Sequence, residues 1–240
     1  DYSGSGIETT FTQGEDACLA ALVPELRTSA TAAVDLLVIG ALADVVEDQF
    51  RRTFDAIGLS NVGFLPPRRA DALPAIGPHT RYLLAQPFLT DTAKALDTRG
   101  ARHVPAPFPL GIEGTTGWLR AAAEACGIDR ATVDTVTAPA VTRARRALER
   151  YRDRLAGKRI FFFPDSQLEI PLARFLAREV GMELVEVGTP YLHKAHLASE
   201  LAWLPSTTRL VEGQDVDRQL DRCREARPDL TVCGLGLANP

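Results

Sequence analysis

The chain has 240 residues, of which 45% are hydrophobic and 24% are charged, a composition typical of a globular protein with one large or two small domains. Its formal net charge of −4 argues against a nucleic-acid-binding protein, which usually carries a basic face that neutralises phosphates. No apolar run approaches the roughly 20 residues of a bilayer span, and no signal peptide is visible. We therefore expect a cytoplasmic protein with no transmembrane segment and no nucleic acid as a partner.

The first element is a small-residue loop that leads directly into a helix. Thr12 and Glu15 have the T-x-x-E spacing of a capping box, and Asp16 adds negative charge at the positive end of the helix dipole. Apolar residues then recur at helical spacing, at Leu19, Leu22, Val23 and Leu26. A glycine-containing loop before a capped helix normally follows a β-strand, and none precedes Asp1, so we expect the chain to be part of a longer protein.

Strands and helices then alternate. The apolar run 33–40 predicts a strand covered on both faces, as in a parallel sheet. Asp44 and Glu47 are expected to cap a helix that ends at Gly58. Its predicted inner face consists of Val46, Phe50, Thr53, Phe54 and Ile57. Further strands are expected over 62–65, 80–85 and 102–104, and a helix over 90–96.

A proline-rich connection, residues 105–111, is expected to be stiff and irregular. Two helices follow over 115–126 and 129–155, and Pro139 is expected to break or kink the second near its start. The alternation then restarts, with strands over 159–163, 183–187, 208–211 and 229–236, and helices over 170–181 and 215–226. This order predicts tandem doubly wound, Rossmann-like parallel-sheet domains of the α/β class. The last strand ends in a glycine turn where another helix should begin, so both termini are expected to be truncations.

Ligands of open parallel sheets bind beyond the carboxyl ends of the strands. In this sequence the rule selects the loops 4–10, 40–44, 86–90, 107–116, 164–167, 188–191, 212–214 and 234–240. The Gly4-Ser5-Gly6 sequence matches neither the G-x-G-x-x-G dinucleotide motif nor a P-loop. A structural turn is therefore the favoured interpretation of these three residues.

Other reactive side chains have ordinary explanations. His193 and His196 lack a third metal ligand at a recognisable spacing, so we interpret them as an exposed pair. Ser166, with Glu169 three residues later, is interpreted as a helix cap rather than a nucleophile. The cysteines are far apart and are expected to be buried free thiols: Cys18, Cys126, Cys223 and Cys233. A series of arginines is expected to be a solvated helix surface, with docking of an acidic partner as the alternative: Arg143, Arg145, Arg146, Arg150, Arg152 and Arg154.

Five separated segments carry a resemblance to a known family. They are YSGSGIETTFTQGED at 2–16, PFPLGIEGTT at 107–116, FPDSQLE at 163–169, EGQDV at 212–216 and LTVCGLGLANP at 230–240. In this order they closely resemble the N subunits of light-independent (dark-operative) protochlorophyllide reductases, a nitrogenase-like family whose subunits have three similar α/β domains. On this resemblance the chain comprises the end of a first domain (1–28), a middle α/β domain (29–111), a helical crossover (112–157) and a third α/β domain truncated at its C-terminal end (158–240).

The resemblance implies an oxidoreductase of chlorophyll and bacteriochlorophyll biosynthesis. In that family N and B subunits form a heterotetramer, and an ATP-driven iron-sulfur L protein delivers electrons to a [4Fe-4S] cluster between them. The cluster passes electrons to protochlorophyllide, whose ring D double bond is reduced to give chlorophyllide. The implied partners are therefore the B subunit, the L protein and protochlorophyllide.

The resemblance also indicates what this chain should lack. The family's N-subunit cluster ligands are cysteines of the first domain, which are expected upstream of Asp1, and none of the four cysteines here stands in a matching context. We therefore assign no catalytic residue and no metal ligand, and expect the chain alone to be inactive. Residues expected to lie near the cluster and pigment cavity as shaping backbone are Gly4, Ser5, Gly6, Glu8, Thr9, Gly111 and Thr115.

Two alternatives have the same kind of architecture. A two-domain glycosyltransferase also sets paired α/β sheets around a cleft, but the carboxylates expected on a nucleotide ribose are not evident. A non-catalytic protein that binds a metal chelate is the second alternative, and such proteins are normally exported.

Overall fold

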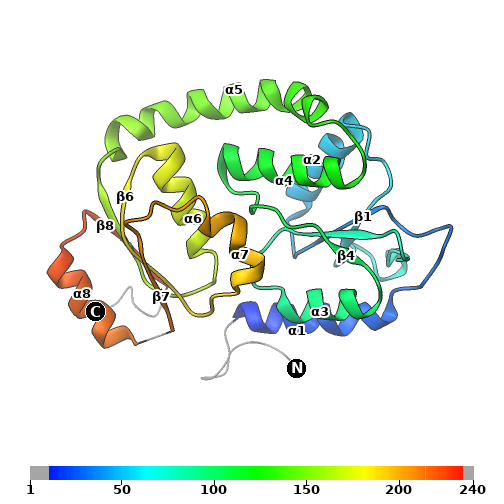
Figure 1. The fold of residues 1–240 in the computed structure, drawn as a ribbon, viewed down its shortest axis with the longest axis horizontal. Helices are drawn as coiled ribbons and strands as arrows, with labels where there is room; N and C mark the ends of the chain where they lie inside the picture. The colour runs from blue at the N-terminus through cyan, green and yellow to red at the C-terminus, as the bar shows by residue number, and fades with distance from the viewer. Residues whose placement is uncertain (1–10, 214, 235–240) are drawn as a thin grey trace. The chain divides into compact units, whose positions relative to one another are not determined.

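The computed structural model describes residues 11–213 and 215–234, and the chain divides into two compact units (Figure 1). Unit 1 comprises Asp1–Pro109 and Thr116–Pro139, and unit 2 comprises Leu110–Thr115 and Ala140–Pro240. Each unit contains a sheet of parallel strands with helices beside it, which confirms the predicted α/β fold with two parallel sheets. None of the described helices is both long and apolar enough to cross a bilayer.

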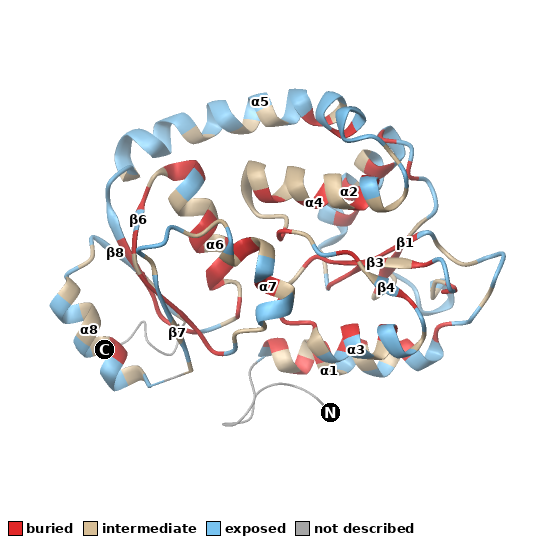
Figure 2. Ribbon diagram, in the orientation of Figure 1, coloured by how far each residue is buried: buried red, intermediate tan, exposed pale blue. Residues whose placement is uncertain are grey.

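The sheet of unit 1 has buried strands at its centre. In spatial order the strands are β2 (Val62–Leu65), β1 (Leu36–Ile39), β3 (Arg81–Leu84) and β4 (Arg102–His103). Leu36 lies opposite Val62 on one side and Arg81 on the other. All of β1 is buried, as a strand covered on both faces should be (Figure 2). The apolar run in the sequence therefore predicted this strand correctly.

Helices lie on both sides of this sheet. They are α1 (Phe11–Leu22), α2 (Asp44–Ala56), α3 (Thr90–Thr98), part of α4 (Gly111–Ala125) and the start of α5 (Arg130–Leu155), with short 3-10 turns η1 (Val23–Glu25) and η2 (Ala70–Ala72). Phe50 and Phe54 of α2 pack against Trp118 of α4, with ring centroids 4.7 and 5.7 Å apart. The Trp118 indole also donates to the Leu84 carbonyl at 2.8 Å. A buried aromatic cluster with its one polar group satisfied therefore fixes these helices to the end of β3.

Asp16 ties α1 to the start of α3, which lies beside it (Figure 1). Its buried carboxylate accepts the backbone N–H groups of Asp91 and Thr92 at 2.8 and 2.9 Å, and the Thr92 hydroxyl at 2.7 Å. The first N–H groups of a helix have no partner within the helix, so a carboxylate here satisfies them and complements the helix dipole. The sequence analysis assigned Asp16 to the dipole of its own helix, α1, whereas the Asp16 carboxylate caps α3.

The predicted caps of the first two helices are wrong in detail. Thr12 lies within α1 rather than before it, and the Glu15 carboxylate accepts the N–H of Ala41 at 3.2 Å. Burial raises the pKa of Glu15. Asp44 is the first residue of α2, after the N-cap Ala43.

The inner face of α2 also differs from the prediction at one position. Val46 is exposed, and Glu47 is buried in its place because it pairs with Arg51 at 2.7 Å and Arg68 at 3.0 Å. Apolar spacing alone does not reveal a carboxylate that is buried together with its cations. Phe50, Phe54 and Ile57 are buried as expected.

Unit 2 repeats the architecture with a different strand order. Its strands are β7 (Arg209–Glu212), β6 (Glu183–Thr189), β5 (Arg159–Phe162) and β8 (Leu230–Val232), in that spatial order. The helices are the remainder of α5, α6 (Glu169–Phe175), α7 (Lys194–Leu201) and α8 (Val216–Ala226), and a π-helix η3 (Leu176–Val180) continues α6. The side chain of Asp215 caps α8 by accepting the N–H of Arg218 at 3.2 Å.

Three predictions about helices need correction. The helix α4 begins at Gly111, four residues before the predicted start, and α7 occupies a stretch in which no helix or strand was predicted. The helix α5 runs through Pro139 without a break.

The four cysteines are free, as predicted, but they are not buried: Cys18 and Cys233 are exposed, and Cys126 and Cys223 are partly exposed.

Replacing Asp16 by Ala should lower the free energy of unfolding by about 2 kcal/mol, because two N–H groups and a hydroxyl lose a charged acceptor at a buried site. Asp91, on the same helix start, is exposed, and its side chain pairs with exposed Lys94, so Asp91→Ala is the matched control. It should lower the free energy of unfolding by less than about 0.7 kcal/mol. Urea unfolding of both variants measures the difference. Equal losses would contradict the assignment of Asp16 as the cap of α3.

Candidate functional site

The carboxyl ends of β1 and β3 form the switch point of the first sheet, because the chain leaves β1 to one neighbour and later returns to the other. Gly40 follows β1 with φ +146°, and a Cβ atom there would lie 2.7 Å from Oε1 of Gln86, which follows β3. The two loops approach so closely that a side chain at residue 40 would displace its neighbour. These are two of the predicted loops, 40–44 and 86–90, and they lie together in unit 1.

The equivalent point of the second sheet lies between β5 and β8. The turn after β5 is held by Glu169, whose Oε1 accepts the N–H groups of Asp165 and Ser166 at 2.8 and 2.6 Å. Burial raises the pKa of Glu169. Gly234, after β8, lies against the Asp165 carboxylate, which leaves no room for a Cβ atom. The Glu169 carboxylate returns to the Ser166 N–H, as in the predicted capping box, but the predicted cap by Ser166 is wrong, because the N-cap residue of α6 is Leu168 and no side chain caps it. The Ser166 hydroxyl instead accepts the N–H of Leu168 at 3.5 Å.

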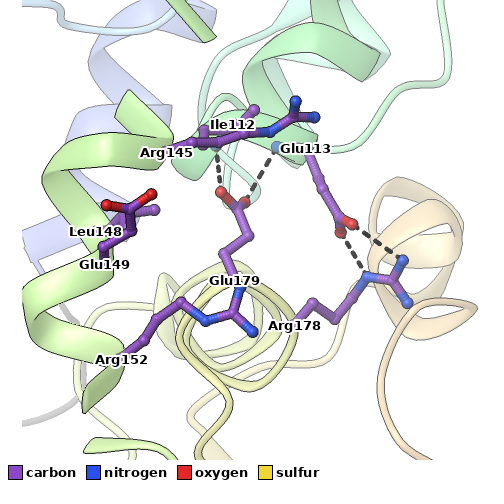
Figure 3. Close-up of a pocket in the computed structure, with 8 residues that line it drawn as sticks. All are labelled: Ile112, Glu113, Arg145, Leu148, Glu149, Arg152, Arg178 and Glu179. Atoms are coloured by element: carbon purple, nitrogen blue, oxygen red, sulfur yellow. Dashed lines mark hydrogen bonds and ion pairs between the residues drawn. The ribbon is translucent and has the colours of Figure 1, made fainter. Parts of the chain in front are cut away.

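The start of α4 and the π-helix η3 also approach each other closely, and a pocket of about 300 Å³ lies beside this contact within unit 2 (Figure 3). The Glu179 carboxylate accepts the N–H groups of Ile112 and Glu113 at 2.6 and 3.1 Å. Gly111 has φ +70°, and a Cβ atom at this residue would overlap Glu179 and Phe175. Glycine is therefore required here both by its backbone conformation and by the space available.

Arginines from α6 and η3 support this arrangement. Arg174 is fully buried and pairs with Glu200 at 2.8 Å and with Glu179 at 3.3 Å. Arg178 pairs with Glu113 at 2.5 Å, and this contact raises the pKa of the Arg178 guanidinium. Burial of Glu179 outweighs its hydrogen bonds and its contact with Arg174, so its pKa is raised above the usual value. The pocket is thus lined by both arginines and glutamates around the N-terminus of α4. The Glu179 carboxylate occupies the position at this N-terminus that an anionic ligand would otherwise take.

The remaining side chains of the pocket come from α5. Arg145, Leu148, Glu149 and Arg152 line it opposite α4 and η3 (Figure 3). The sequence analysis did not single out Arg174, Arg178 or Glu179. Glu179 and Arg178 contact residues more than sixty positions away, and Arg174 pairs with Glu200, 26 positions away. No local pattern in the sequence marks such partners.

The predicted site residues have different outcomes. Gly4, Ser5, Gly6, Glu8 and Thr9 lie outside the described residues. Gly111 and Thr115, predicted to belong to a cavity-shaping loop, instead form part of the first turns of α4. Their expected position near a cluster stays a prediction.

His193 and His196 lie at the start of α7 with ring centroids 6.2 Å apart. Within residues 11–213 and 215–234, no group of three or more His, Cys, Asp or Glu side chains is placed to hold a metal ion. The cysteines are divided between the units, with Cys18 and Cys126 in unit 1 and Cys223 and Cys233 in unit 2. The described part of the chain therefore does not bring together the convergent thiolates that an iron-sulfur cluster requires.

Comparison with known proteins identifies the family. Residues 2–238 match the family model of nitrogenase component 1 type oxidoreductases. The chain belongs to this family. It is 72% identical over 241 residues to the light-independent protochlorophyllide reductase subunit N of Bradyrhizobium sp. strain ORS 278, and 71% identical over 240 residues to that of Rhodospirillum rubrum. These alignments cover 100% of this chain and 56% and 54% of those proteins, so the chain spans about half the length of these relatives.

Solved structures agree with the family assignment at the level of the fold. Two structures of nitrogenase Cp1, at pH 6.5 and pH 5, align with TM-scores of 0.61 and 0.70. They cover 96% of this chain and 59% and 54% of the nitrogenase chains, at 16% and 12% identity. Family members of this kind are oxidoreductases, which favours the reductase over the glycosyltransferase and chelate-binding alternatives.

Replacing Gly111 by Ala should lower the free energy of unfolding by about 3 kcal/mol, because a left-handed backbone and overlap with Glu179 and Phe175 act together. Gly127 has a similar φ, +77°, with open space around the missing side chain, so Gly127→Ala is the control for the backbone effect alone. The Gly127→Ala variant should lower the free energy of unfolding by about 1 kcal/mol. Chemical denaturation measures both values, and an equal loss of unfolding free energy in the two variants would contradict this account.

The raised pKa of Glu179 predicts a specific pH dependence. Between the pKa of an unfolded glutamate and that of folded Glu179, the folded state binds more protons, so the free energy of unfolding falls as pH rises through this window. Glu179→Gln cannot titrate and should make that slope shallower between pH 4.5, the usual value, and the folded pKa. Glu149→Gln, an exposed change in the same pocket, is the control. An unaltered slope in Glu179→Gln, measured by denaturation at several pH values, would show that Glu179 is not the titrating group.

Proposed function

We propose that this chain is part of the N subunit of a light-independent protochlorophyllide reductase. The observation that carries the proposal is 72% identity over the whole chain to a protein of that name. In this role the complete protein reduces the ring D double bond of protochlorophyllide to give chlorophyllide. The predicted division into residues 1–28, 29–111, 112–157 and 158–240 belongs to the same proposal, as does a cytoplasmic location.

The proposal assigns the chain a scaffolding role in that reaction. Both sheets present close-approach loops at the carboxyl ends of their strands, after β1 and β3 in unit 1 and after β5 and β8 in unit 2. In open parallel sheets this edge is where ligands bind. Gly40 and Gly234 allow backbone to come close there, and Gly111 does so at α4. We infer that these loops, with Gly4, Ser5, Gly6, Glu8, Thr9 and Thr115, shape the surroundings of the pigment and of the electron carrier.

A [4Fe-4S] cluster would supply single electrons in the complete protein, but the described residues do not fit its ligand set. The four free cysteines are dispersed over two units, and no metal-binding group is formed among the described residues. We propose that the thiolate ligands lie in the part of the longer relatives that this chain does not cover. The proposal extends to the partners: a B subunit in a heterotetramer, and an ATP-dependent iron-sulfur L protein that delivers electrons.

Purified without oxygen, the 240-residue chain should contain no stoichiometric iron or sulfide, because it lacks a convergent set of thiolates. Iron and acid-labile sulfide assays check this. The complete N subunit, co-purified with its B subunit, serves as the positive control. A stoichiometric centre on the 240-residue chain would contradict the proposed division of roles.

Substitution of Glu8 by Gln together with Thr9 by Ala should lower pigment turnover in the full-length, reconstituted enzyme, because these residues are proposed to shape the cavity. Formation of chlorophyllide and the iron content of the complex are the measurements. Glu25→Gln, an exposed change in the same N-terminal part of the chain, is the control. Unchanged turnover together with unchanged iron content would remove the opening loop from the site.

A further inference from the structure

The outer side of α5 carries a continuous line of four arginines. Arg143, Arg146, Arg150 and Arg154 are separated by three, four and four residues, so they lie on one side of the helix and span roughly 16 Å of its length. We call these four residues the arginine stripe. All four are exposed, and Figure 2 shows most of this part of α5 as exposed surface. All of them belong to unit 2.

No described carboxylate neutralises the stripe. Residues 140–155 contain six arginines and only Glu149 and Asp153 as acidic residues. None of the ion pairs among the described residues involves the four stripe guanidinium groups, and the one hydrogen bond described for them joins Arg150 to the hydroxyl of Tyr151 at 2.7 Å. Like charges three and four residues apart destabilise a helix. The stripe is therefore a concentration of positive charge on a chain whose net charge is −4.

The chemistry of the stripe favours phosphate groups. A guanidinium group is planar, always charged and able to hold a phosphate through two parallel hydrogen bonds. The stripe contains arginine alone, and it lies on the convex surface of a long helix rather than in a groove. A convex line of this kind fits a flat anionic surface, against which each basic residue contributes separately.

A protein partner is less well matched. Protein interfaces normally have a core that is depleted in charge and rich in apolar or aromatic side chains. Among stripe neighbours, only Tyr151 is a large exposed hydrophobic residue, and its hydroxyl and ring are occupied by Arg150. A single-stranded nucleic acid is also less well matched, because the aromatic ring beside the stripe, that of Tyr151, is covered by Arg150 and is not free to stack on a base.

We propose that the arginine stripe is a docking surface for an anionic lipid bilayer, which holds the protein at a membrane surface through phosphate headgroups. The association is peripheral and electrostatic, because the stripe carries no apolar residue, and Leu148, on another side of this part of α5, is partly buried where it lines the pocket at α4. It is a separate property from pigment reduction.

The test compares two pairs of arginines on the same helix. Arg146 and Arg150 lie at the centre of the stripe, whereas Arg145 and Arg152 lie on roughly the opposite side, where they line the pocket at α4. Arg146→Gln with Arg150→Gln, and Arg145→Gln with Arg152→Gln, remove the same charge from exposed positions of one helix. The two variants therefore lose the same charge from opposite sides of α5.

Binding of the complete protein that carries this chain is measured by flotation with phosphatidylcholine vesicles containing about 30% phosphatidylglycerol, and with phosphatidylcholine alone. The unaltered protein should bind only the anionic vesicles and be released near 1 M salt. The stripe variant should bind about 25-fold more weakly, roughly fivefold for each arginine removed, and the pocket-side variant should lose clearly less. Failure of the unaltered protein to bind, binding to both kinds of vesicle alike, or equal losses in the two variants would overturn the proposal. Vesicle binding does not depend on turnover, so this result is independent of the proposed reductase function.

Discussion

The interaction on which the organisation of unit 2 depends most is the one between the Glu179 carboxylate and the first N–H groups of α4. Those groups have no partner within the helix, and burying them without an acceptor would cost about 1–3 kcal/mol each. Glu179 reaches them because residue 111 is a glycine in a left-handed conformation, and because Arg174 and Glu200 form a buried ion pair beside it. The π-helix η3 contributes both Arg178 and Glu179 to the same contact region. One carboxylate thus links a turn, a helix start and a buried charge pair.

Much of the fold could be predicted from the sequence because the parallel strands are short apolar runs separated by glycines and prolines. The strand β2 matches its predicted range, and β1, β3 and β5 lie within theirs. What could not be predicted is the destination of the carboxylates. Asp16, Glu47 and Glu179 each satisfy groups that only the folded chain brings near, so sequence spacing assigned Asp16 to the wrong helix and left Glu47 and Glu179 out of the core. The helix α7 was not predicted for a different reason, because its apolar residues do not recur at a clear helical spacing.

The candidate site was predictable in a different way. The general rule for parallel sheets selected the loops after β1, β3, β5 and β8, and glycines do make close approaches there. The family resemblance, and not any spacing of reactive groups, indicated the reaction. This is consistent with a stretch that supplies shape and rigidity, because its cysteines are dispersed and its buried carboxylates are engaged by backbone N–H groups or arginines.

Pro139 has a consequence for the hydrogen bonding of α5. A proline has no N–H group, so the Thr135 carbonyl does not receive the hydrogen bond that residue 139 would otherwise donate to it within α5. The division between the two units falls between Pro139 and Ala140. The helix α5 therefore lacks one of its internal hydrogen bonds at the residue where the chain passes from one unit to the other.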